Sequence, residues 1–159
     1  MHSEIYWIDT NSTKRLGIMA RPRAGDWLGD EIGHWKREGV GQVVSLLERP
    51  EVDELGLHDE ERLCTAHGMT FVSLPIADRG LPDRGMALAL ARRILASPEP
   101  TAIHCRAGIG RSSVIAAIVL RMTGMDGDVA FAAIEKARRL VVPDTVAQRD
   151  WVTALQLED

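Results

Sequence analysis

The sequence has few cysteines, few aromatic residues and no long apolar run, and these shortages exclude several classes of protein. Its 159 residues include two cysteines, Cys64 and Cys105, which are too few for a disulfide framework. The longest apolar run, 114–120, is far too short to cross a bilayer. The N-terminus lacks the basic and apolar segments of a signal peptide. We therefore expect a cytoplasmic protein with no membrane association, in a compartment that keeps thiols reduced.

Charge and length narrow the choice further. A net charge of −4 and the lack of a basic run argue against nucleic acid as a partner. The sequence is 45% hydrophobic and 26% charged, which is typical of an ordinary globular protein. The length fits one domain spanning residues 1–159, which we expect to be a monomer.

The stretch 104–113, with the sequence HCRAGIGRSS, combines the residue types of a reactive anion site. A short β-rich segment precedes it at 101–103, and the apolar run follows it, so we predict a buried strand, a loop and a buried helix. The N–H groups of such a loop and of the helix N-terminus can converge on an anion. Gly108 and Gly110 allow the backbone to curl there.

Two side chains could make this cradle a reaction centre. We expect the Cys105 thiol, at a helix N-terminus near the Arg111 guanidinium, to be substantially thiolate near neutral pH. The planar fork of Arg111 can hold two phosphate oxygens, Ser112 could donate a hydrogen bond to the sulfur, and His104 would help orient the loop. The alternative is a buried structural cysteine before an ordinary helix start. That alternative must also explain the two glycines, the arginine and the serine at these offsets.

His104-Cys105-x5-Arg111-Ser112 resembles the signature loop of the cysteine-dependent protein phosphatases, the tyrosine and dual-specificity family. The His-Cys-x-Ala-Gly-x-Gly-Arg-Ser form is especially similar to the small dual-specificity branch, including the phosphatases associated with cyclin-dependent kinases. The resemblance implies that Cys105 is the nucleophile, that a phosphocysteine intermediate forms, and that no metal or other cofactor takes part. The residues that it implies for phosphate binding are Arg106, Ala107, Gly108, Ile109, Gly110 and Arg111.

A second loop supplies candidates for a general acid, because an alkoxide or phenolate leaves poorly without a proton. Pro75-Ile76-Ala77-Asp78 resembles the acid loop of the small dual-specificity phosphatases, in which an aspartate stands three residues after a proline. By that resemblance Asp78 is the general acid, and in the second step it takes a proton from the attacking water. Asp83, in Leu81-Pro82-Asp83, superficially resembles the Trp-Pro-Asp of the larger tyrosine phosphatases. We favour a helix N-cap for Asp83, because aspartate is strongly preferred there.

Several other polar residues have two interpretations. Gln148 lies in a segment similar to one in which family members place a glutamine near the site, but Thr145-x-x-Gln148 is also a capping box. Glu51 and Glu54 could hold the fork of Arg111, although solvated charge is the default for both.

The second cysteine and two histidines also need an interpretation. Cys64 could capture oxidised Cys105, but we favour a core position on a helix face. His58 and His67 lack the clustered spacing of metal ligands.

Hydrophobic patterning and turn residues predict strands at 5–8, 16–20, 42–47, 69–74 and 101–103, with a hairpin joining the first two. Predicted helices cover 26–38, 58–67, 85–96, the run up to Gly124, 126–139 and 145–157, with a short turn at 51–55. We expect Asp26 to cap the first helix and Trp27, Leu28, Ile32 and Trp35 to form its buried side.

The pattern predicts an α/β fold with a central mixed, mostly parallel sheet of about five strands, flanked by helices on both faces. The Cys105 and Asp78 loops both follow strands and should open at one sheet edge.

The expected function is a phosphatase acting on phosphorylated proteins or peptides. With no aromatic recognition loop, a shallow site should accept phosphotyrosine and also phosphoserine or phosphothreonine, and phosphate, vanadate or sulfate-type anions should bind in the loop. One alternative is a phosphatase for another ester, a phosphoinositide or an RNA 5′-phosphate. Phosphoinositide members tend to carry lysines in the loop, where this chain has Ala107 and Ile109, with Arg106 as the additional cation. The other alternative is a non-catalytic phosphate-binding module.

Overall fold

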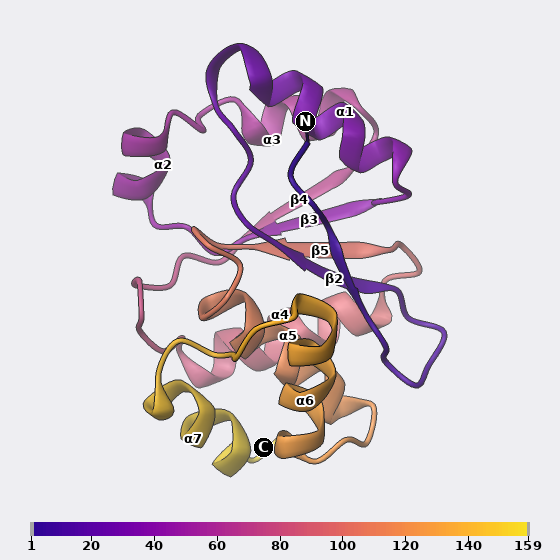
Figure 1. Ribbon diagram of the computed structural model, residues 1–159, viewed down its shortest axis with the longest axis vertical. Helices are drawn as coiled ribbons and strands as arrows, with labels where there is room; N and C mark the ends of the chain where they lie inside the picture. The colour runs from indigo at the N-terminus through magenta and orange to yellow at the C-terminus, as the bar shows by residue number, and fades with distance from the viewer. Residues whose placement is uncertain (1, 159) are drawn as a thin grey trace.

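A single five-stranded sheet forms the centre of the computed structural model, which describes residues 2–158. The strand order is β1-β2-β5-β3-β4 (Figure 1). The strands are β1 Tyr6–Ile8, β2 Leu16–Met19, β3 Gln42–Ser45, β4 Thr70–Ser73 and β5 Thr101–His104. β1 pairs antiparallel with β2 in the expected hairpin, and the remaining neighbours are parallel. The expected mixed, mostly parallel sheet is therefore confirmed.

Helices cover both faces of this sheet (Figure 1). The α-helices in the described part of the chain are α1 Leu28–Arg37, α2 Arg49–Leu55, α3 Glu60–Ala66, α4 Arg84–Ala96, α5 Arg111–Met122, α6 Gly127–Arg138 and α7 Val146–Ala154. Adjacent residues on a strand point to opposite faces. Val44 and Ile103 accordingly join the core beneath α4 to α7, while Val43 and Ala102 join the core beneath α1 and α3.

Three local expectations were wrong. Asp26 and Trp27 lie in a 3-10 turn, Gly25–Trp27, before α1, and no side-chain hydrogen bond caps α1. Trp27 is 57% exposed and stacks its ring against the guanidinium of Arg23 instead of entering the core. The expected turn at 51–55 is helix α2, which begins with Pro50 in its first turn and a capping box between Glu48 and Glu51. Glutamate is not among the favoured N-cap residues, so the start of this helix gave little signal in the sequence.

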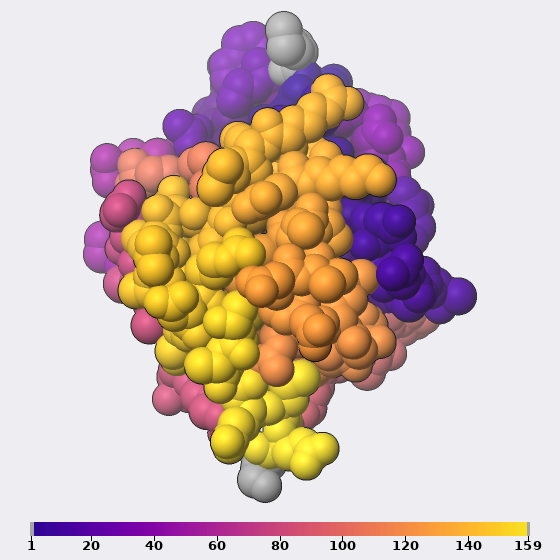
Figure 2. Space-filling model, turned by 60° about the horizontal axis from the view of Figure 1, so that its bottom comes forward, coloured from indigo at the N-terminus to yellow at the C-terminus, as the bar shows by residue number. Residues whose placement is uncertain are grey.

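The C-terminal helices complete the layer that encloses α5. Figure 2 shows the chain from α6 to α7, coloured orange to yellow, spread over one face of the molecule. Every residue of α5 from Arg111 to Leu120 is buried. The N-terminus of α5, which follows the loop expected to bind an anion, is thereby held rigidly against the end of the sheet. Between residues 2 and 158, no helix is both long enough and apolar enough to span a bilayer.

Candidate active site

The loop between β5 and α5 makes close contacts at both of its glycines. Gly108 has φ 71°, and a Cβ there would lie 2.6 Å from the carbonyl of Met19 at the end of β2. A Cβ on Gly110 would lie 2.5 Å from the carboxylate of Asp144. The Gly108 contact is with backbone and requires glycine, whereas the Gly110 contact is with the end of a side chain that can move. The expected anion-binding role of the two glycines stays a prediction.

Cys105 lies at the start of this loop and is 2% exposed. Its Sγ accepts a hydrogen bond from the hydroxyl of Ser112, at 3.0 Å, from the first turn of α5. Ser112 is itself fully buried, so this pairing is fixed by the packing of the helix. The first turn of α5 therefore places a hydroxyl donor directly against the Cys105 sulfur.

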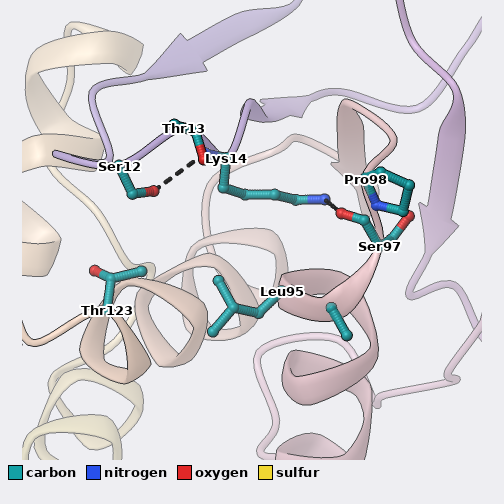
Figure 3. A pocket seen from close by; sticks show the side chains of 8 residues that line it. Ser12, Thr13, Lys14, Leu95, Ser97, Pro98 and Thr123 are labelled. Atoms are coloured by element: carbon teal, nitrogen blue, oxygen red, sulfur yellow. Dashed lines mark hydrogen bonds between the residues drawn. The ribbon is translucent and has the colours of Figure 1, made fainter.

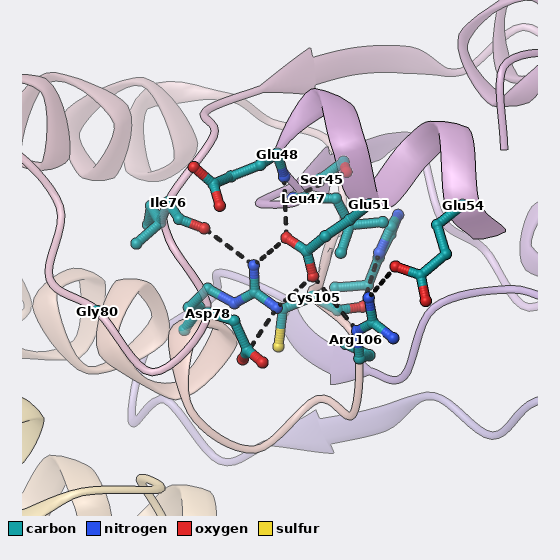
Figure 4. Close-up of polar contacts among 12 residues, drawn as sticks. Ser45, Leu47, Glu48, Glu51, Glu54, Ile76, Asp78, Gly80, Cys105 and Arg106 are labelled. Atoms are coloured by element: carbon teal, nitrogen blue, oxygen red, sulfur yellow. Dashed lines mark hydrogen bonds and ion pairs between the residues drawn. The ribbon is translucent and has the colours of Figure 1, made fainter.

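Arg111 is fully enclosed and uses both of its terminal nitrogens. Figure 4 shows that its acceptors Glu51, Ile76 and Asp78 converge beside Cys105. Nη1 donates to Glu51 Oε1 at 2.6 Å and to the carbonyl of Ile76 at 2.9 Å. Nη2 donates to Glu51 Oε2 at 3.0 Å and to Asp78 Oδ1 at 3.3 Å. The guanidinium therefore joins three segments: the α5 N-terminus, helix α2 and the loop after β4.

Glu51 is the central acceptor of this network. Besides Arg111, its carboxylate accepts hydrogen bonds from the backbone N–H of Glu48 at 3.1 Å and from Arg106 Nε at 3.4 Å. Burial raises the pKa of Glu51, but the hydrogen bonds from Arg111, Glu48 and Arg106 and the charge of Arg111 outweigh it and lower the pKa to about 2. Glu51 thus holds Arg111, which was the alternative considered for it, and the default of a solvated charge was wrong for this residue. Glu54 instead pairs with Arg106, at 3.3 Å.

The two candidate acids occupy different environments. Asp78 contacts Arg111, and its side chain is 57% exposed, so it faces the mouth of the site. Its loop is anchored because the backbone N–H of Ile76 donates to the carbonyl of Leu46, at 3.1 Å. Asp83 caps α4, as its carboxylate accepts the backbone N–H of Met86 at 2.9 Å. The cap expected for Asp83 is confirmed, and Asp78 is the aspartate placed against Arg111.

Gln148 combines a capping role with a contact to the Asp78 loop. Gln148 and Thr145 form the expected capping box, with hydrogen bonds of 3.0 and 3.1 Å. The side-chain amide also donates to the carbonyl of Gly80, at 3.3 Å. Gln148 is fully buried and ties α7 to this loop.

Behind the cysteine, His104 and Glu60 form a buried pair that the sequence did not reveal. His104 Nε2 lies 2.5 Å from Glu60 Oε2, and Nδ1 lies 3.2 Å from the carbonyl of Cys105. Burial lowers the pKa of His104, but the charge and hydrogen bond of Glu60 outweigh this effect and raise it. His104 therefore links the start of the loop to helix α3.

Cys64 belongs to a different part of the molecule. It lies on α3 in the core on the α1 face, whereas Cys105 joins the core on the opposite face, and both thiols are free. Burial raises the pKa of Cys64, and the charges of Glu60 and Glu61 raise it further. These features agree with a core role.

His58 and His67 have local partners. His58 lies 2.6 Å from Asp53, and His67 Nδ1 lies 2.9 Å from the carbonyl of Leu63. Within residues 2–158, no three His, Cys, Asp or Glu side chains are grouped to hold a metal ion.

A cleft of about 700 Å³ lies far from this chemistry, between the β1–β2 hairpin and the end of α4 (Figure 3). Lys14 crosses it and donates to the carbonyls of Ser97 and Glu99, at 3.0 and 2.7 Å, and to the hydroxyl of Thr101 at 3.2 Å. These bonds attach the β1–β2 hairpin to the segment between α4 and β5. The chemistry is concentrated at the Cys105 loop instead.

The site has the features of a cysteine-dependent phosphatase. These are a buried thiol with a hydroxyl donor, a glycine loop before a helix, and an arginine beside an exposed aspartate. Residues 17–125 match the model of the family Tc-R-P, described as "polymorphic toxin system, DSP-PTPase phosphatase". The chain therefore belongs to this phosphatase family, within the cysteine-dependent tyrosine and dual-specificity phosphatase superfamily. No curated protein matches the sequence significantly.

Solved structures of phosphatases share this fold. Kinase associated phosphatase, crystallised with its catalytic cysteine replaced by serine, is 21% identical with a TM-score of 0.88, over 96% of this chain and 93% of that chain. TpbA of P. aeruginosa in complex with phosphotyrosine is 18% identical with a TM-score of 0.62, over 96% and 91%. PTPMT1 in complex with PI(5)P is 18% identical with a TM-score of 0.74, over 93% and 92%. At these identities the likeness establishes the fold, and the ligands differ from one neighbour to another.

Proposed function

We propose that this phosphatase hydrolyses phosphate monoesters on protein side chains, phosphotyrosine foremost, through a phosphocysteine intermediate. One observation carries the proposal: Arg111 brings Asp78 to the loop in which Cys105 accepts the hydrogen bond of Ser112. A nucleophile, an anion-holding fork and a proton donor thus meet at one edge of the sheet. Phosphoserine and phosphothreonine are included because no aromatic wall is expected to deepen the site.

In the first step, the Cys105 sulfur attacks phosphorus while the N–H groups of residues 106–111 hold the phosphate oxygens, together with Arg111 through Nε and through the Nη2 hydrogen that Asp78 releases. Asp78 donates a proton to the leaving oxygen as the P–O bond breaks. In the second step, water attacks the phosphocysteine, Asp78 accepts its proton, and the sulfur departs as a thiolate stabilised by Ser112. His104 and Gln148 support the two loops and take no part in the transfer.

The charges around the loop favour a substrate carrying one phosphate over a multiply phosphorylated inositol ring. Arg106, the additional cation of the loop, is paired with Glu51 and Glu54. Ala107 and Ile109 supply no positive charge. TpbA was crystallised with phosphotyrosine but PTPMT1 with PI(5)P, so a phosphoinositide is the alternative that needs a direct test.

We also propose that residues 1–159 form a single phosphatase domain that acts as a cytoplasmic monomer. Helices α6 and α7, which lie beyond the family match, pack on α5, and α7 brings Gln148 to the Asp78 loop. Both thiols are free, which agrees with a reducing compartment.

Purified protein should be assayed for kcat/KM on phosphotyrosine, phosphoserine and phosphothreonine peptides, on phosphoinositides and on RNA 5′-triphosphate. We expect the highest value on phosphotyrosine peptides, unaffected by EDTA. Cys105→Ser should abolish turnover while inorganic phosphate still binds. Preference for a phosphoinositide or RNA would refute the protein substrate, and full activity of Cys105→Ser would refute the mechanism. Phosphate binding without hydrolysis of any substrate would indicate a non-catalytic module.

A further inference from the structure

Arg138, the last residue of α6, reaches back to the phosphate loop. Its Nε donates to the carbonyl of Gly108 at 3.1 Å, and its Nη2 donates to the carbonyl of Ala107 at 3.0 Å. The guanidinium also lies over the ring of Tyr6 on β1, 4.3 Å from the ring centroid. One side chain thus fastens two consecutive carbonyls of the loop from outside the 104–113 motif.

These two carbonyls determine where two N–H groups of the loop point. In a trans peptide unit the C=O and N–H bonds point in opposite directions. The Ala107 carbonyl shares its unit with the N–H of Gly108, and the Gly108 carbonyl shares its unit with the N–H of Ile109. Holding both carbonyls on the side of α6 therefore turns both N–H groups to the other side of the loop.

The loop needs such a restraint at this point. Gly108 has φ 71°, and glycine can rotate between conformations at low cost, so the two peptide units beside it are the easiest in the loop to flip. A flipped unit would point a carbonyl oxygen at a bound phosphate. Arg138 opposes the flip because its Nε and Nη2 form a planar fork that matches two neighbouring acceptors.

Tyr6 restricts the guanidinium in turn. A guanidinium over an aromatic face is attracted by the ring, so Tyr6 limits the movement of the Arg138 side chain. The β1–β2 hairpin and α6 pack together, so strand β1 supplies the base on which Arg138 rests. Lysine would retain the charge at this position but could not present two donors in a fixed plane.

We propose that Arg138 is a positioning residue, which keeps the N–H groups of Gly108 and Ile109 directed at the phosphate. This inference rests on the proposed function of the Cys105 loop. It assigns a role in anion binding to a residue that contacts neither the sulfur nor Asp78. Because Arg138 lies on the side of the carbonyls, it acts through the backbone of the loop and not through contact with substrate.

The test compares Arg138→Met and Arg138→Lys with a matched variant, Arg121→Met. Arg121 also donates to two backbone carbonyls, those of Val152 and Leu155, but it lies at the opposite end of α5 from the loop. The readouts are the inhibition constant of inorganic phosphate, kcat/KM on an aryl phosphate, and Tm. Calorimetric binding of phosphate in a Cys105→Ser background measures affinity without turnover.

We expect both Arg138 variants to bind phosphate about 10-fold or more weakly and to lose a similar factor in kcat/KM. Arg121→Met should lower Tm and leave phosphate affinity unchanged. A lowered Tm with unchanged phosphate affinity in Arg138→Met would overturn the proposal, as would full recovery of affinity in Arg138→Lys. If Arg138→Met does not fold, Arg138→Lys decides the question alone. Failure of the wild-type protein to hydrolyse any phosphate ester would instead count against the proposed function.

Discussion

The Glu51 carboxylate and the Arg111 guanidinium form a two-point pair, with one hydrogen bond of 2.6 Å and one of 3.0 Å. Both side chains are buried, so each depends on the other to offset the cost of leaving water. The pair fixes the plane of the fork before any phosphate arrives. Preorganisation of this kind avoids reorganisation during the reaction.

Replacement of Glu51 by glutamine should therefore impair both catalysis and acid stability. The pKa of Glu51 is lowered to about 2 in the folded protein, whereas in the unfolded chain it is near 4.5. The ionised carboxylate therefore stabilises the fold above about pH 4.5, and this stabilisation is lost as the pH falls toward 2. We expect wild-type unfolding free energy to decline through that window and the decline to be shallower in Glu51→Gln. We also expect kcat/KM to fall by about 10- to 100-fold. Urea unfolding between pH 2 and 6 and steady-state kinetics measure the two effects.

Glu54→Gln is the matched control. Among residues 2–158, Glu54 pairs with Arg106 alone, and its side chain is 67% exposed, so we expect little change in stability or kcat/KM. Equal effects of the two substitutions would show that general charge, and not the two-point pair, matters.

Arg111→Lys should be severely impaired, because an ammonium cannot bind both oxygens of Glu51 and the carbonyl of Ile76 in one plane while it also holds a phosphate. We expect kcat/KM to fall by about 10² or more. Tm should also fall, because Glu51 loses its two-point partner. Kinetics and thermal unfolding check this prediction. Activity within a few-fold of wild type would mean that a point charge suffices.

Some parts of this site could be predicted from the sequence and others could not. Residues 104–113 could be interpreted because strand, loop, helix and reactive side chains are contiguous, so the local pattern alone defines their geometry. The position of the Asp78 loop could be predicted with one further rule, that loops after parallel strands lie at the same edge of the sheet. The contact between Asp78 and Arg111 agrees with that rule.

Glu60 and Arg138 could not be found in this way. Glu60 is 44 residues from His104, and Arg138 is 30 residues from Gly108, so their contacts depend on how whole helices dock. In the sequence both are ordinary charged residues of amphipathic helices. The prediction for Trp27 was wrong because this residue lies in the 3-10 turn before α1, whereas Leu28, Ile32 and Trp35 lie in the helix and are buried as expected.

The buried pair of His104 and Glu60 predicts a dependence of stability on pH in the alkaline direction. The pKa of His104 is raised in the folded protein, chiefly because the charge of Glu60 outweighs burial. The ion pair of His104 therefore stabilises the fold fully when the pH is below the unfolded histidine pKa near 6.5. This stabilisation is lost as the pH rises through the pKa that His104 has in the folded protein. We expect unfolding free energy to decline as the pH rises above about 6.5 in the wild type, and to decline less in Glu60→Gln. Glu61→Gln, exposed on the same helix, is the control and should keep the wild-type slope.

Cys64→Ala should leave activity within a few-fold of wild type and should not alter recovery from oxidation. Cys64 is fully buried in the core on the α1 face, and burial raises its pKa, so it remains a protonated thiol away from Cys105. The measurement is inactivation by hydrogen peroxide followed by dithiothreitol. Loss of reversibility in Cys64→Ala alone would identify Cys64 as the residue that captures oxidised Cys105.

The choice between Asp78 and Asp83 as the acid can be decided by the leaving group. An alcohol or phenol of high pKa leaves badly as an anion, so its protonation in the transition state contributes about 10²–10⁴ in rate. An activated aryl phosphate hardly needs that proton. Asp78→Asn should therefore lose far more kcat/KM on phosphotyrosine peptides than on an activated aryl ester, and it should flatten the basic limb of the pH–rate profile.

Asp83→Asn is the natural control, because Asp83 accepts the Met86 N–H as the cap of α4 and does not contact Arg111. Asparagine also caps helices well, so this variant should show a small change in Tm and the same kcat/KM ratio between the two substrates. The experiment measures kcat/KM of both variants on aryl phosphates of rising leaving-group pKa. A steep dependence in Asp83→Asn with none in Asp78→Asn would reverse the assignment. A flat dependence in both would mean that another group supplies the proton, and Asp78 would then act only through its contact with Arg111.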